Sequence, residues 1–107
     1  MGGFQGKDTD SVLEQIREML ADGLVTETEP FPESAVEFAK ILDQLRELDD
    51  DDLKGRLVIG GFTDKPYGPD EMRCQECIYF LVHKKWCDLP ELAVPVEHDW
   101  WCRLWKI

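Results

Sequence analysis

The sequence predicts a small α+β fold in two parts: an acidic α-helical hairpin over residues 1–53 and a loop-rich part with short strands over residues 54–107. Charge divides the chain in this way, since residues 1–53 hold 15 acidic and 4 basic side chains, whereas residues 54–107 hold 8 of each. All four cysteines and all four tryptophans fall in the second part. Such asymmetry indicates two segments with different roles.

The first helix is expected over about residues 11–22. Ser11 and Glu14 have the spacing of a capping box. Apolar residues then recur at the spacing of one helical face: Val12, Leu13, Ile16, Met19 and Leu20. Gly23 is suited to end this helix.

The second helix is expected over about residues 32–49, because proline is favoured in a first helical turn and Pro32 lies there. Its apolar stripe is Ala35, Phe38, Ile41, Leu42, Leu45 and Leu48. The acidic run Asp49–Asp52 opposes the helix dipole and predicts a frayed end. Two helices with one apolar face each, joined by a short connector, predict an antiparallel hairpin.

The second part offers little regular structure. Leu57, Val58 and Ile59 predict a short strand that ends at Gly60 and Gly61. Beyond it, prolines and glycines interrupt the chain and few apolar runs exceed three residues. A bound metal would supply the organisation that such a segment lacks, so we expect a metal-organised fold.

The composition excludes several classes of function. A net charge of −11 argues against binding of nucleic acid or of an anionic membrane. The chain has no run of 18 apolar residues and no motif of a phosphate loop, a nucleophile elbow or a metallohydrolase. We therefore expect a non-enzymatic protein that is cytoplasmic, unless an export leader has been removed.

The four cysteines are the strongest chemical signal. Their spacing is Cys74-x2-Cys77-x9-Cys87-x14-Cys102. It is compatible with a Zn²⁺ site of four thiolates, two disulfides, a redox-active CxxC or an iron-sulfur cluster. Aromatic residues crowd the cysteines and favour the cluster, because its potential depends on exclusion of water.

An ordered series of landmarks supports the cluster. They are Phe62-Thr63-Asp64-Lys65-Pro66, Cys74-x-x-Cys77-x-x-Phe80, Cys87 and Trp101-Cys102-x-x-Trp105. This series resembles the high-potential iron-sulfur proteins, over about residues 57–107. Two positions depart from the family pattern: Phe62 stands for a tyrosine, and Trp100 for a glycine. Residues 1–53 have no counterpart in that family.

The resemblance implies that Cys74, Cys77, Cys87 and Cys102 hold one [4Fe-4S] cluster, with Zn²⁺ as the alternative metal. It also implies that Phe62, Phe80, Trp101 and Trp105 form an aromatic cage around the cluster. Proteins of this type transfer one electron, so the implied partner is another redox protein. The alternative is a structural or interaction module of a larger assembly, stapled by the metal, with an assembly partner in place of the redox protein.

The two histidines, His83 and His98, are weaker candidates. Four thiolates already complete a site, so neither is needed as a ligand.

Overall fold

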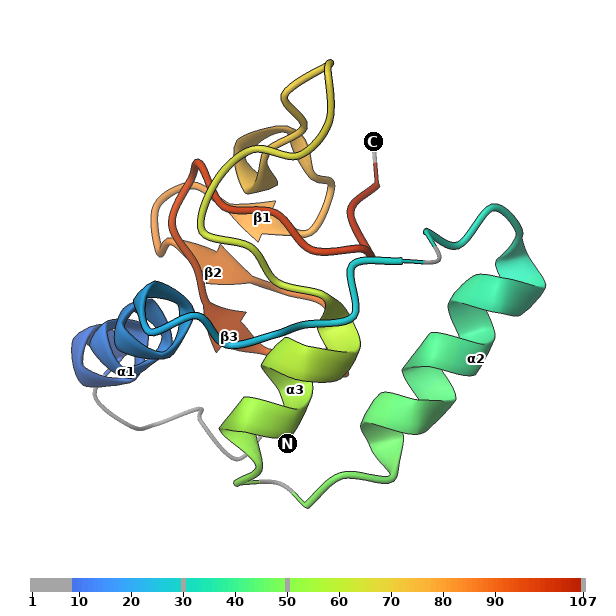
Figure 1. Ribbon diagram of the computed structural model, residues 1–107, viewed down its shortest axis with the longest axis horizontal. Helices are drawn as coiled ribbons and strands as arrows, with labels where there is room; N and C mark the ends of the chain where they lie inside the picture. Colours follow the sequence, from blue (N-terminus) through green and yellow to red (C-terminus); the bar gives the residue numbers. More distant parts are fainter. Residues whose placement is uncertain (1–8, 30, 50, 107) are drawn as a thin grey trace.

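The structure is a computed structural model that describes residues 9–29, 31–49 and 51–106. It contains three α-helices, α1 (Thr9–Ala21), α2 (Ala35–Arg46) and α3 (Leu53–Gly60), and a short 3₁₀ helix, η1 (Cys74–Glu76). Three two-residue strands, β1 (Phe80–Leu81), β2 (Trp86–Cys87) and β3 (Val94–Pro95), form an antiparallel sheet in the order β1-β2-β3 (Figure 1). The predicted small α+β class is confirmed.

Helix α1 begins at Thr9, so Ser11 lies inside its first turn and the predicted capping box at Ser11 is wrong. Its end agrees with the sequence. Gly23 has a φ of 90°, and the amides of Gly23 and Leu24 donate to the carbonyls of Leu20 and Met19. This is the Schellman pattern, which uses a left-handed glycine to satisfy the last helical carbonyls.

Helix α2 begins three residues after the predicted Pro32. Ser34 is its N-cap and accepts a hydrogen bond from the amide of Glu37 at 3.2 Å. The helix ends at Arg46, before the acidic run. Asp52, at the end of that run, is the N-cap of α3 and accepts from the amide of Gly55 at 2.8 Å. The acidic run therefore follows the end of α2 and supplies the N-cap of α3.

The strand predicted at Leu57–Ile59 is wrong, because these residues lie in α3. Signals at the two ends of the helix outweigh the strand preference of the β-branched residues Val58 and Ile59. The first is the Asp52 cap, and the second is Gly61, which has a φ of 68° and closes the helix through its amide. Local propensity is a weak determinant when both ends of a helix are satisfied in this way.

The predicted antiparallel hairpin is also wrong. Helix α1 packs on β3 and α2 packs on α3, so the two helices stand on opposite sides of the molecule (Figure 1). Their apolar faces contribute Ile16 and Leu45 to one hydrophobic core. The second part of the chain contributes Leu57, Leu92 and Val96 to the same core. The two predicted parts thus share a core, because each helix alone leaves an apolar stripe exposed.

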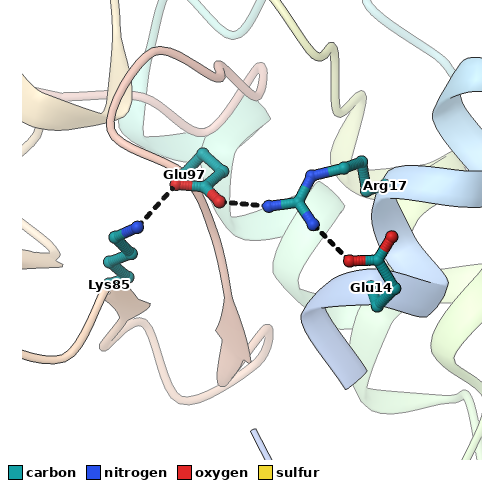
Figure 2. A network of polar contacts seen from close by, with 4 residues as sticks. All are labelled: Glu14, Arg17, Lys85 and Glu97. Atoms are coloured by element: carbon teal, nitrogen blue, oxygen red, sulfur yellow. Dashed lines mark hydrogen bonds and ion pairs between the residues drawn. The ribbon is translucent and has the colours of Figure 1, made fainter. Parts of the chain in front are cut away.

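Ion pairs add to this packing across the two parts. Glu97 pairs with Arg17 of α1 and, at 3.2 Å, with Lys85, while Arg17 also contacts Glu14 (Figure 2). On the other side, Arg46 of α2 contacts Glu91 at 2.7 Å. Such partly exposed pairs contribute little to stability.

The αL position of Gly61 provides a test of this architecture. A Cβ at Gly61 would lie 2.4 Å from the carbonyl oxygen of Glu27, whereas at Gly68, with a φ of 75°, it would meet nothing within 4 Å. Left-handed backbone strain costs an alanine about 1–3 kcal/mol at either position. We expect Gly61→Ala to lower the free energy of unfolding clearly more than Gly68→Ala, as measured by urea denaturation. Equal losses would show that the contact with Glu27 is unimportant.

Candidate metal centre

The four cysteines converge on one pocket. Cys74, Cys77, Cys87 and Cys102 all line it, although 28 positions separate the first from the last. Its cavity volume is only about 10 Å³, about the space of one water molecule, so the lining side chains nearly fill it. Its other lining residues are apolar or aromatic: Phe62, Phe80, Val96 and Trp105. Four thiols in an apolar setting are the donor set that zinc and iron-sulfur clusters use.

Helix η1 positions the first two cysteines. It begins at Cys74, and the amide of Cys77 donates to the carbonyl of Cys74 at 2.9 Å. This tight turn lets both side chains reach the same pocket. The amide of Cys74 donates to the carbonyl of Trp100 at 2.6 Å, which ties the turn to the segment before Cys102.

The sheet positions Cys87. It lies in the central strand, β2, opposite Phe80 of β1 and Val94 of β3. Because both neighbours are fixed by strand pairing, the Cys87 side chain is held beside the Phe80 ring in the pocket wall. The amide of Asp88 also donates to the carbonyl of Tyr79 at 2.7 Å, which extends the pairing past the strand.

Cys102 is held by contacts of the residues on either side of it. Thr63 and Trp101 exchange two backbone hydrogen bonds, of 2.7 and 3.1 Å. Arg103, which is 3% exposed, donates from its amide to Gly60 and from Nε to the carbonyl of Ile59, both at 2.9 Å. Since Ile59 and Gly60 end α3, the guanidinium also compensates the negative end of the helix dipole.

The predicted aromatic cage is only partly present at the pocket. Phe62, Phe80 and Trp105 line it, as expected. Trp101 does not line it, but is fully buried and stacks on Tyr67, with ring centroids 4.0 Å apart. Val96 lines the pocket and was not anticipated, because an isolated valine carries no chemical signal in the sequence. His83 and His98 are exposed and do not line the pocket.

The electrostatics favour neutral thiols when no metal is present. Burial raises the pKa of Cys87 to about 12 and also raises the pKa values of Cys74 and Cys102. The neighbouring cysteines raise these pKa values as well, which reflects the proximity of the four sulfur atoms. A metal would replace the protons and bind the thiolate form.

Two backbone amides act in the opposite direction. The amides of Leu89 and Leu104 bond to the sulfur atoms of Cys87 and Cys102 and lower their pKa values. Each amide lies two residues after its cysteine. Hydrogen bonds to ligand sulfur stabilise negative charge there and tune the potential of a bound cluster.

The four sulfur atoms have the chemistry of metal ligands and share one pocket. The four cysteines are free thiols in this structure. Within residues 9–29, 31–49 and 51–106, no set of three or more His, Cys, Asp or Glu side chains has the closed geometry of a metal site. The pocket thus lines up the four donors without forming a closed metal site.

Comparison of the chain with models of known families, with curated proteins and with solved structures finds no match. In the part of the chain that the structure describes, no helix has the length and apolar character needed to cross a membrane.

The raised thiol pKa values predict how the stability of the metal-free chain depends on pH. An unfolded cysteine ionises near pH 8.5, whereas folded Cys87 keeps its proton up to a pH of about 12. The unfolded state therefore loses protons first, and the free energy of unfolding falls as pH rises through this interval. Urea denaturation with reductant and chelator should show a plateau below about pH 8 and a decline above it. A matched Cys87→Ser chain, which cannot ionise at this position, should decline less, and an identical decline would contradict the assignment.

Proposed function

We propose that the chain binds one [4Fe-4S] cluster through Cys74, Cys77, Cys87 and Cys102. The observation that carries the proposal is the convergence of four free thiols, distant in sequence, on one apolar pocket. Chance placement of four cysteines in a chain of this size would seldom bring all of them to a single site. The resemblance of residues 57–107 to high-potential iron-sulfur proteins agrees with this set of ligands.

The hydrogen bonds to sulfur in the pocket favour a cluster over a single zinc ion. The amides of Leu89 and Leu104 already point at ligand sulfur atoms. Fe–S clusters use such hydrogen bonds, together with exclusion of water, to set their potentials.

We further propose one-electron transfer as the role of the cluster. Phe62 and Phe80 would keep water from the cluster, which protects its oxidised form. Trp105 lines the cysteine pocket and also an outer groove with Phe31, Phe38 and Lys106. A redox partner bound in this groove would therefore be separated from the cysteine pocket by a single side chain, the Trp105 indole. No substrate or enzymatic step is required by this role.

A second candidate is a structural staple in an interaction module. It is favoured by the shared core, since α1 packs on β3 and Val96, next to β3, lines the pocket. A metal there would stabilise the surfaces of α1 and α2 as well as its own surroundings. The acidic helices would then be the binding surface, and the metal need not change its oxidation state.

Anaerobic purification followed by metal and sulfide analysis distinguishes these candidates. A cluster gives four iron atoms and four sulfides per chain with broad visible absorption, whereas a zinc site gives one zinc ion and no colour. Reversible one-electron voltammetry of the iron form would support electron transfer. Iron and sulfide without a reversible wave would favour the staple, and stoichiometric zinc would contradict the cluster.

Replacing one ligand should abolish the centre. We expect Cys87→Ser to lose stoichiometric metal and to unfold at a lower temperature, with the circular dichroism of α1 and α2 lost in the same transition, because the shared core couples both helices to the pocket. The control is Val94→Thr, which buries a hydroxyl opposite Cys87 but leaves every thiol in place. Full metal content in Cys87→Ser would show that Cys87 is not a ligand.

Removing one wall of the pocket should admit water. Phe80→Ala is expected to shorten the lifetime of the air-exposed cluster roughly tenfold, the scale of changes in residues around a metal site. Phe38→Ala is the matched control, since Phe38 packs against the same core but does not line the pocket. The decay of visible absorption measures the effect. Equal decay in both variants would show that Phe80 does not shield the site.

A further inference from the structure

A groove lies between the start of α1 and the turn that joins β1 to β2. Asp10 and Leu13 line one wall of this hairpin groove, and residues 82–86 line the other. Its cavity volume of about 500 Å³ falls in the range of pockets that bind ligands. The hairpin groove shares no lining residue with the cysteine pocket or with the outer groove beside Trp105. It is therefore a separate feature of the surface, and its role does not depend on a metal.

Part of the lining is apolar. Leu13 and Trp86 are each 8% exposed, whereas Val82 is 68% exposed. A single exposed valine is ordinary on a protein surface, but Val82 borders a groove that two further apolar side chains line. An apolar side chain inserted there would remove Val82 from water and would also contact Leu13 and Trp86.

Much of the remaining lining is basic. His83, Lys84 and Lys85 line the hairpin groove, and of its described lining residues only Asp10 carries a carboxylate. Lys84 and Lys85 are the only adjacent lysine or arginine residues in a chain whose net charge is −11. Among residues 9–29, 31–49 and 51–106, no carboxylate pairs with Lys84. The groove therefore favours a negatively charged group, whereas the chain as a whole repels one.

The two walls of the hairpin groove are tied to the same segment. Glu97 contacts Arg17 of α1 and, at 3.2 Å, Lys85 of the turn (Figure 2). The amide of Val96 also donates to the carbonyl of Lys85 at 2.9 Å. Within the turn, the amide of Lys84 donates to the carbonyl of Leu81 at 3.1 Å. A groove whose walls are held in this way loses little conformational freedom when it binds a partner.

We propose that the hairpin groove binds an acidic segment of a partner protein, anchored by one apolar side chain. The anchor contacts Leu13, Val82 and Trp86, while carboxylates on either side of it pair with the two lysines. Phosphate or another small anion would leave the apolar lining unused. A second copy of the chain would bring a further net charge of −11 close, which repulsion opposes. A short segment brings only the charges that the groove pairs.

Fluorescence anisotropy of a labelled peptide, Glu-Glu-Leu-Glu-Glu, titrated with the full chain under reductant tests the proposal. We expect saturable binding that weakens as salt is added, because the two lysines are exposed. Two control peptides, one with glutamine for every glutamate and one with serine for the leucine, should each bind roughly tenfold more weakly. Absence of saturable binding, or equal binding of the leucine and serine peptides, would overturn the proposal.

Charge reversal provides a matched pair of variants. Lys84→Glu should weaken binding of the leucine peptide roughly tenfold, since it removes one attraction and adds a repulsion. Lys65→Glu makes the same change of net charge at an exposed position outside the groove and should leave binding nearly unchanged. Val82→Ser should weaken binding severalfold with no change in charge. Equal weakening by the two lysine variants would show that net charge alone matters and would overturn the site.

Nuclear magnetic resonance of the full chain locates the bound peptide, and thermal unfolding checks that each variant is folded. The backbone amides of Leu13 and of residues 82–86 should shift when peptide is added, and shifts confined to other residues would overturn the site. Sedimentation without peptide tests for a second copy in the groove. A monomer supports the proposal, whereas a dimer that Lys84→Glu abolishes would assign the groove to a second copy and overturn it.

Discussion

The segment Trp100–Arg103 makes the backbone contacts that hold the second half of the chain together. Its residues bond to η1 through Cys74, to the loop at Thr63 and to the last turn of α3 at Ile59 and Gly60. A chain with two-residue strands has few ladder hydrogen bonds to organise it. This one segment therefore substitutes for a larger sheet, and it places Cys102 where the other three cysteines meet.

The four thiols lie in an apolar pocket, and their burial there makes their ionisation costly. Apolar walls raise the thiol pKa values, while the amides of Leu89 and Leu104 favour negative charge on two of the sulfur atoms. These opposing effects suit a site that is neutral without metal and anionic with it. Metal affinity in such a site is linked to the release of protons and to the stability of the whole fold.

The N-terminal helices α1 and α2 complete the hydrophobic core. A chain of 107 residues can bury only a limited apolar area, and α1 and α2 supply 25 of the 33 α-helical residues that the structure describes. Packing of α1 on β3 and of α2 on α3 completes a core that neither half supplies alone. The acidic excess stays on the outer faces of the helices, where Arg17 and Arg46 reach Glu97 and Glu91.

The sequence by itself determined the fold class, the two amphipathic helices and the cysteine set, because these depend on composition and on periodicities that need no long-range contact. It did not determine that Leu57–Ile59 is helical, since the decisive signals are the caps at Asp52 and Gly61 and the packing of α2. Only the tertiary structure placed Val96 in the pocket and turned Trp101 away toward Tyr67. Neighbouring residues of an extended segment point to opposite sides, and which side faces the pocket is decided by contacts with distant parts of the chain.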